Sequence, residues 1–322
     1  MAGGAMRTTL ALAVVLLAAC AAEVRTDVEG LRAALPDEAA IRIGSPAPPP
    51  SPEATTAEVI AAAPAFGSGY ARTTFWSAAT VNAGLAWSLG RLRLVVSLPP
   101  TSCDELACSW GPWIDREGLN VWRLVARHDG GGWAFNLDAR PGSAPSTPFA
   151  PIVAGVIQRG ALPGRGHGSL QMDFEAAAAL DHPPGWQQED FGRLEIQYDA
   201  RAALRVDATA VGVRSRDPEA PEPVNAVYAF RAAEGGGGGE LQLAVETLEA
   251  APTTLSLRSR WDGAGAGRGD AVSSAEPASE SECWGDAASS FALVYDSGAS
   301  PLVGSEGACA FLPALAATLT LP

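Results

Sequence analysis

The feature that most constrains this sequence is a series of short segments between residues 121 and 261 in which apolar and polar side chains alternate. Residues 121–128 and 133–140 alternate in this way on either side of a glycine-rich turn at residues 129–132. Alternation with a period of two around an Asp-Gly turn is the strongest short-range indication of a β-hairpin. The stretch is therefore predicted to form one large antiparallel sheet.

The same alternation continues along the rest of the stretch. One polar face and one apolar face are typical of an antiparallel sheet that meets water on one side. No helical crossover pattern separates the segments, which disfavours a parallel, doubly wound sheet. We expect about nine or ten strands from the number of such segments. The apolar row predicted to face the core comprises Phe135, Leu137, Leu170, Phe174, Leu194 and Ile196.

A helix is predicted over residues 73–98, ahead of the sheet. Its apolar side chains recur at helical spacing, and Pro99 and Pro100 end the pattern. Alternation within residues 91–95 leaves a strand at the end of this segment open. We expect the amphipathic helix to cover the apolar face, so the predicted fold class is mainly β, a large antiparallel meander shaped as a half-barrel or curved sheet. The helical stripe consists of Val81, Leu85, Leu89, Leu92 and Val96.

The N-terminus carries an export signal. Arg7 precedes an apolar run of ten residues, Leu10–Ala19, which is too short to span a bilayer. The run ends in Leu17-Ala-Ala-Cys20, which resembles the lipobox of bacterial lipoproteins. We therefore predict a signal peptide over residues 1–19 and attachment of lipid, palmitate included, to Cys20. An ordinary secretory peptide with an incidental cysteine is the alternative.

These signals predict a protein of the bacterial cell envelope, anchored by lipid in the outer membrane. Residues 20–69 are predicted to be a lipidated N-terminus and linker, although apolar residues recur at helical spacing within residues 23–43. Within the linker, the proline-rich stretch at residues 45–52 is expected to be stiff and extended and to lift the domain off the membrane, or to be a disordered tail. Residues 70–322 are predicted to form a single β domain with its covering helix. The membrane is the expected partner, through lipidated Cys20.

The net charge of −14 bears on other partners. A strongly acidic surface repels phosphate backbones, which argues against binding of nucleic acid. No segment after the signal peptide is apolar over the 18 residues or so that a transmembrane helix needs, so none is expected.

Four cysteines remain when Cys20 is set apart. An even number in an exported chain suggests two disulfides, for which three pairings exist. The pairing Cys103–Cys108 and Cys283–Cys309 is favoured, because it closes one tight loop and one surface loop. Loop-closure entropy gives these bonds about 2 and about 3.5 kcal/mol of stabilisation. No histidine lies near either pair, so neither a metal site nor a cofactor is expected.

The sequence predicts no catalytic residue. The histidines at positions 128, 167 and 182 are not spaced as metal ligands. Ser169 lies two residues from His167, but neighbours on one strand face do not make a catalytic triad, and the chain has no Gly-x-Ser-x-Gly motif. Residues 262–280, with their glycine-rich part at 263–269, are predicted to be a loop and flexible turn. The aromatic-rich residues 110–113 are predicted to form a packed corner.

Several short motifs resemble a group of uncharacterised lipoproteins from GC-rich Gram-negative bacteria. They are Leu98–Cys103 with Trp110–Pro112, Ser259–Trp261 with Gly265–Arg268 and Asp270, and Glu282–Trp284 with Phe291 and Tyr295. The resemblance implies a lipoprotein and brings no activity with it. In the expected pattern an acidic residue directly follows Glu-Cys-Trp, whereas here Gly285 precedes Asp286.

Three functional hypotheses follow. The first is a binding module that holds a lipid or other hydrophobic ligand between helix and sheet, as the likeness of the predicted meander to the half-barrel of lipoprotein carriers suggests. The second is a structural or interaction lipoprotein with a filled core, and the third is a hydrolase. An apolar cavity under the helix would favour the first, close packing there the second, and converging His, Ser and carboxylate groups the third.

Overall fold

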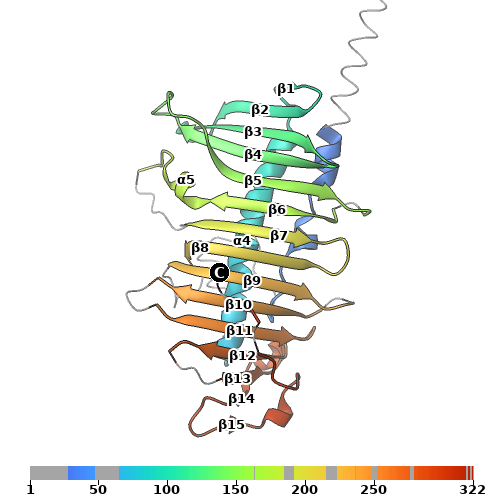
Figure 1. Cartoon of the computed structure of the whole chain (residues 1–322), viewed down its shortest axis with the longest axis vertical. Helices are drawn as coiled ribbons and strands as arrows, with labels where there is room; N and C mark the ends of the chain where they lie inside the picture. Colours follow the sequence, from blue (N-terminus) through green and yellow to red (C-terminus); the bar gives the residue numbers. More distant parts are fainter. Residues whose placement is uncertain are drawn as a thin grey trace, which may run out of the picture.

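Fifteen strands form one open antiparallel sheet, and each strand pairs with its neighbours in sequence (Figure 1). The predicted antiparallel meander is therefore confirmed, but the expected nine or ten strands were too few. The computed structural model describes residues 28–47, 65–162, 164–184, 192–214, 223–235, 237–248, 252–275, 279–316, 318–319 and 321. Cys20, the predicted signal peptide and most of the proline-rich stretch lie outside these residues.

The strands follow the chain from one end of the sheet to the other. They are β1 (Ser102–Cys103), β2 (Ala107–Ile114), β3 (Asn120–Asp129), β4 (Gly132–Pro141), β5 (Ala150–Arg159), β6 (Gly166–Asp173), β7 (Arg193–Asp199), β8 (Arg205–Arg214), β9 (Pro223–Ala232), β10 (Gly239–Thr247), β11 (Thr254–Trp261), β12 (Gly267–Ser273), β13 (Ser279–Trp284), β14 (Leu293–Asp296) and β15 (Val303–Gly304). The helices are α2 (Glu38–Ile41), α4 (Gly69–Ser97), α5 (Phe174–Ala178) and the 3-10 turns η1 (Ala287–Ser289) and η2 (Glu306–Ala308). Residues 28–34 are also helical.

The first predicted hairpin forms as expected. In β3 and β4, Asp129 lies opposite Gly132, and Leu124 lies opposite Leu137. Gly130 and Gly131 make the two-residue turn with φ of 54° and 105°, in the left-handed region that favours glycine. The Asp-Gly-Gly-Gly sequence therefore sets both the turn and the register of this hairpin.

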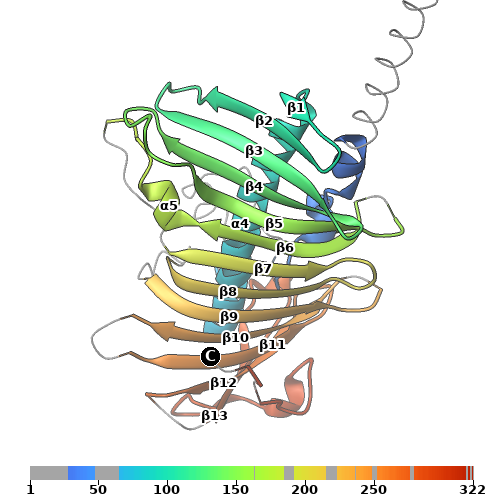
Figure 2. The ribbon, with the colours of Figure 1, turned by 45° about the horizontal axis from the view of Figure 1, so that its top comes forward.

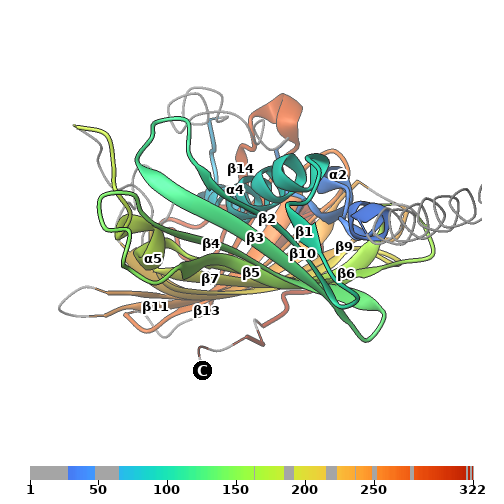
Figure 3. The same ribbon diagram turned by 90° about the horizontal axis from the view of Figure 1, so that it is seen from above.

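The two faces of the sheet differ in what lies on them. Figure 3 shows α2 and α4 on one face, here called the inner face. The C-terminal segment, from Cys309 onward, lies on the opposite, outer face. Of the predicted inner row, Phe135, Leu137, Leu170, Leu194 and Ile196 are at most 3% exposed. Phe174 differs, because the carboxylate of Asp173 accepts a hydrogen bond from the Ala176 amide at 2.8 Å and starts α5 there.

Helix α4 occupies the inner face over most of the length of the sheet (Figures 1 and 2). It begins four residues before the predicted start, because Ser68 caps it by accepting a hydrogen bond from the Ala71 amide at 3.1 Å. Residues 91–95 are helical, which excludes a strand there. The predicted stripe is at most 2% exposed and consists of Val81, Leu85, Leu89, Leu92 and Val96. These side chains share one hydrophobic cluster with inward residues of the strands.

Contact between α4 and the sheet is close at Gly84. A Cβ atom at this position would lie 2.7 Å from Cδ2 of Leu194 and 3.2 Å from Sδ of Met172. Both distances are shorter than ordinary van der Waals contact, so only glycine fits without movement of its neighbours. The absence of a side chain lets the helix axis approach β6 and β7.

Residues 28–47 belong to the folded core. The buried apolar residues of this segment are Val28, Leu31, Ala34, Leu35, Ile41, Ile43 and Ala47. The side chain of Asn82 in α4 holds the segment in place, since it accepts from the amide of Ile43 at 2.8 Å and donates to its carbonyl at 2.9 Å. The folded part of the chain is thus larger than the predicted unit of residues 70–322, and part of the predicted linker is core.

The same segment also completes the C-terminal end of α4. The Nε of Arg32 donates to the carbonyl of Val96 at 2.7 Å, and its Nη2 donates to the carbonyls of Ser97 at 3.2 Å and Leu98 at 3.4 Å. These carbonyls have no partner within the helix, and a cation there also matches the negative end of the helix dipole.

The largest error of sequence interpretation concerns residues 262–280. They were predicted to be a loop, yet β12 lies within them and pairs with both β11 and β13. The reason lies at Gly269, where an added Cβ would come 2.8 Å from Cβ of Tyr70 in α4. Glycine is needed at position 269 because α4 approaches the strand closely there, and not because the chain turns. The turn itself is confined to residues 262–266.

Candidate functional site

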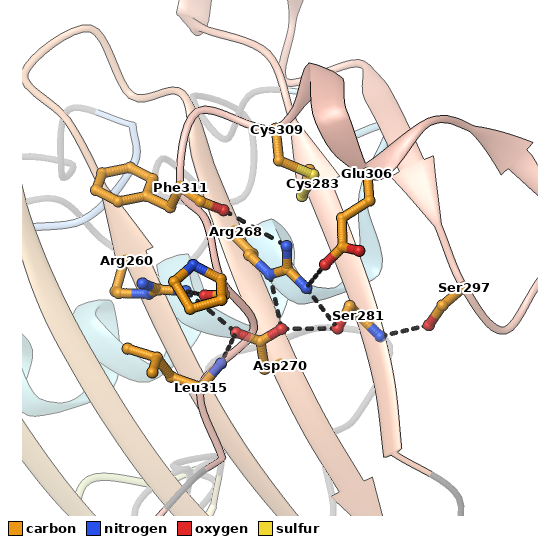
Figure 4. The surroundings of a disulfide bond; sticks show 11 residues. Arg260, Arg268, Asp270, Ser281, Cys283, Ser297, Glu306, Cys309, Phe311 and Leu315 are labelled. Atoms are coloured by element: carbon orange, nitrogen blue, oxygen red, sulfur yellow. Dashed lines mark hydrogen bonds and ion pairs between the residues drawn. A yellow bond between two sulfur atoms is a disulfide. The ribbon is translucent and has the colours of Figure 1, made fainter.

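The motif residues from Ser259 to Tyr295 lie on β11 to β14 and in the turns between them, at one end of the sheet, whereas Leu98–Cys103 and Trp110–Pro112 lie at the other end. The two disulfides are Cys103–Cys108 and Cys283–Cys309, the pairing that the sequence favoured. The second ties the C-terminal segment to β13 (Figure 4). From there the segment crosses the outer face, where its backbone carbonyls at Phe311 and Pro313 accept hydrogen bonds from Arg268 and Arg260.

A buried ionic network lies beneath this segment (Figure 4). Arg268 and Asp270 are 1% and 2% exposed, and Nε of the arginine donates to the carboxylate at 2.8 Å. The carboxylate also accepts from Oγ of Ser281 at 2.7 Å, from Arg260 at 3.3 Å and from the amide of Leu315 at 3.1 Å. Both carboxylate oxygens are therefore saturated by the protein itself, as a buried charge requires.

This geometry assigns a structural role to the Arg-Gly-Asp tripeptide. Its charged side chains are buried and paired, so they are not displayed for recognition by another molecule. Sequence interpretation did not find the network because it placed residues 262–280 in a loop. The available signal was the two-residue spacing of Arg268 and Asp270, which puts both side chains on one face of a strand.

On the inner face, the same strands hold the start of α4. Oε2 of Glu282 accepts from Oγ of Ser68 at 2.5 Å and from the amide of Tyr70 at 3.0 Å. A carboxylate at this position satisfies free amides and opposes the positive end of the helix dipole. Tyr70 also donates its hydroxyl to Glu280, and burial together with that carboxylate raises the pKa of Tyr70.

The Glu-Cys-Trp motif thus has three separate structural roles. Glu282 caps α4, Cys283 pins the C-terminal segment, and Trp284 is 1% exposed in an aromatic cluster with Phe75 and Phe291. Asp286 comes one residue later than the acidic residue of the expected pattern, because Gly285 precedes it. Its carboxylate accepts a hydrogen bond from the Ser289 amide at 2.9 Å and starts η1. The β11–β14 end of the sheet is a junction, held together on both faces.

An open groove on the outer face of β5 to β9 is the better candidate for binding. Its volume is about 540 Å³. The polar side chains along it belong to Gln158, His167, Ser169, Glu195, Gln197, Asp199, Arg205, Asp207 and Arg231. Alternation places these residues outward while Leu170, Leu194 and Ile196 point to the core.

Some charges in the groove are already paired. Arg231 lies 2.7 Å from the carboxylate of Asp207. Hydrogen bonds from Arg201 lower the pKa of Asp199 to about 2. In contrast, the side chains of Ser169, Glu195 and Gln197 have no partner in the part of the chain that the structure describes. Hydroxyl, carboxylate and amide groups of this kind can hydrogen-bond a hydrophilic ligand.

The groove does not form a serine-hydrolase site. It contains both His167 and Ser169, as their shared strand face predicts. However, Nδ1 of His167 is buried without a hydrogen-bond partner among the described residues, and the Asp199 carboxylate is held by Arg201 instead. A triad requires the histidine to be oriented by its acid and bonded to its nucleophile. His128 and His182 do not line this groove.

No protein-family model, curated protein or solved structure matches this chain. Across the described ranges, no helix combines the length and hydropathy needed to cross a membrane. The same residues contain no group of three or more His, Cys, Asp or Glu side chains arranged to hold a metal ion. Functional inference therefore depends on the chain's own geometry.

Proposed function

We propose that this protein is a lipid-anchored protein of the bacterial cell envelope that acts through its exposed surface, as a structural or interaction lipoprotein with a filled core. Lipidation of Cys20 anchors it in the outer membrane. The close contact of Gly84 with Leu194 and Met172 is the observation that carries this choice over a carrier of hydrophobic ligands. A carrier needs space between helix and sheet, and at this point even one methyl group would have to displace the ends of the Leu194 and Met172 side chains.

In this proposal α4 is a fixed cover of the inner face and not a movable lid. Three sets of contacts along its length support this role. Glu282 holds its first turn, Oγ1 of Thr74 donates to Oγ of Ser259 at 2.6 Å, and Arg32 binds its last carbonyls. Opening the helix would break these hydrogen bonds, of which the one between Thr74 and Ser259 is buried, and would expose the apolar stripe, which makes opening costly.

The outer-face groove of β5 to β9 is the surface that we assign to interaction. Its unpaired hydroxyl, carboxylate and amide groups suit a hydrophilic partner. The apolar inner face is occupied by α4 and residues 28–47, which leaves the outer face as the accessible side of the sheet (Figure 3).

Gly84→Leu tests the filled core. The leucine would overpack the contact with β6 and β7, so we expect it to destabilise the protein by about 1–3 kcal/mol. Gly90→Leu is the matched control, because nothing lies within 4 Å of a Cβ at Gly90 in the same helix. Replacing glycine in an exposed helical position should raise stability by up to about 1 kcal/mol.

Thermal melts and uptake of a fluorescent hydrophobic probe are measured on both variants. The filled-core proposal predicts weak probe uptake by the wild type and a lower melting temperature for Gly84→Leu alone. Strong uptake by the wild type that Gly84→Leu abolishes, with its melting temperature unchanged, would instead show a ligand cavity under α4.

A further inference from the structure

The position of residues 28–47 changes where the membrane tether ends. Val28 and Leu31 are 4% and 0% exposed, so the chain is fixed in the core from residue 28 onward. The proline-rich stretch comes after this fixed point and before α4, which begins at Gly69. It therefore connects two parts of the core and cannot act as the spacer between domain and membrane that the sequence suggested.

Only residues 20–27 then separate the proposed lipid on Cys20 from the core. Eight residues span at most about 28 Å even when they are fully extended. The fifteen strands, at about 4.8 Å between neighbours, extend over about 67 Å from β1 to β15. The tether is thus less than half the length of the sheet, and the point where it enters the core decides which end can reach the bilayer.

That entry point lies near the β1–β2 end. Arg32 binds the last carbonyls of α4, and the carbonyl of Leu98 at this helix end also accepts from Nε1 of Trp110 in β2 at 2.9 Å. Figure 2 shows the segment of residues 28–47 starting beside β2 and β3, while β12 and β13 lie at the far end of the sheet.

Several exposed apolar side chains lie at this end, although Leu302 beside β15 at the opposite end is also 59% exposed. Leu94 and Leu98 at the end of α4 are 69% and 57% exposed, Leu106 in the β1–β2 turn is 71% exposed, and Ile114 at the end of β2 is 65% exposed. Aliphatic side chains of this kind are stabilised at the boundary of headgroups and acyl chains. The adjacent Asp104 and Glu105 are acidic and are repelled by anionic lipids, so the proposed contact depends on the apolar side chains and on the tether.

From these observations we propose that the β1–β2 end of the sheet faces the bilayer surface, held against it by the short tether of residues 20–27, with Leu94, Leu98, Leu106 and Ile114 directed to the lipid. This rests on the proposed lipidation of Cys20. The β13–β15 end is the part of the domain farthest from the membrane.

The orientation is tested with the lipidated full-length protein in vesicles of phosphatidylethanolamine and phosphatidylglycerol that contain an acceptor-labelled lipid. A fluorescent amino acid is introduced at Leu106 or at Leu302, which are 71% and 59% exposed at opposite ends of the sheet. Energy transfer to the bilayer is expected to be strong from position 106 and weak from position 302. Equal transfer from the two positions, or stronger transfer from 302, overturns the proposal.

Two insertions of the same Gly/Ser linker, of about 20 residues, identify the tether itself. Such a linker has a root-mean-square length of about 25 Å. Inserted after Glu23, it should lower transfer from position 106, whereas after Pro52 it should leave transfer unchanged. The opposite result would make the proline-rich stretch the spacer and overturn the inference. Vesicle flotation distinguishes failure of the proposed lipid anchor from failure of the proposed orientation. A protein that does not float with the vesicles contradicts the anchor. A protein that floats but shows equal energy transfer from both positions contradicts only the orientation.

Discussion

At the scale of single residues, Asp270 is the group on which most of the outer-face junction depends. It joins two arginines, one hydroxyl and one backbone amide of the C-terminal segment. Removing the charge from such a site leaves buried cations without full compensation, and that cost exceeds the net contribution of the intact pair.

We predict that Asp270→Asn lowers the free energy of unfolding by about 3 kcal/mol, because Arg268 stays buried and keeps only Glu306, at 2.8 Å, as an anionic partner among the described residues. Urea unfolding followed by circular dichroism measures this change. Asp207→Asn is the control on the same face of the sheet, where the partner Arg231 is 42% exposed. An exposed pair contributes at most about 1 kcal/mol, so similar losses in both variants would contradict the role assigned to Asp270.

At the scale of elements, α4 joins strands that are distant along the meander. Its middle packs on Leu194 and Met172 in β7 and β6, and its first turns contact Ser259 in β11, Gly269 in β12 and Glu282 in β13. A sheet whose strands pair only with sequence neighbours has no other element described here that spans it in this way. The helix therefore makes one cooperative core out of successive hairpins.

Leu89→Asp should consequently unfold the domain. Leu89 is fully buried, and an unpaired carboxylate there would have to be desolvated without a partner. Loss of the cooperative thermal transition in circular dichroism is the expected result.

Leu94→Asp, on the same helix at a side chain that is 69% exposed, should keep the wild-type melting temperature. A native-like melt for Leu89→Asp would show that the packed face of α4 is dispensable for folding, and would contradict the role of α4 as part of the core.

At the scale of the whole molecule, the proposed anchor decides where the protein acts. Cys20→Ser should abolish labelling by fatty acid and move the protein from the membrane fraction to the soluble fraction, because it removes the thiol that carries the proposed lipid. Membrane fractionation with metabolic palmitate labelling measures both effects. Ala22→Ser, two residues beyond the cysteine, should leave both unchanged. Retention of Cys20→Ser in the membrane would contradict the lipid anchor.

The sequence alone determined those features that depend on local pattern. Period-two alternation predicted the faces of β4, β6 and β7, since the pleat puts every second side chain on the same side. Helical spacing predicted which face of α4 is buried. The favoured cysteine pairing also followed from spacing, because one bond closes a tight loop and the other a surface loop.

Tertiary structure alone decided the features that depend on what approaches a segment from elsewhere. Gly267–Ser273 has the composition of a turn, yet it is a strand because it pairs with β11 and β13, and Gly269 leaves room for Tyr70 of α4. Phe174 continues an alternating pattern, and Asp173 turns it into a helix by capping. Residues 28–47 look like a tether in sequence. They belong to the core because Asn82 hydrogen-bonds the backbone of Ile43 and their apolar side chains pack on the inner face. In these cases local periodicity does not show which other residue will make the deciding contact. The proposed placement of the membrane tether depends on the contact between Asn82 and residues 28–47.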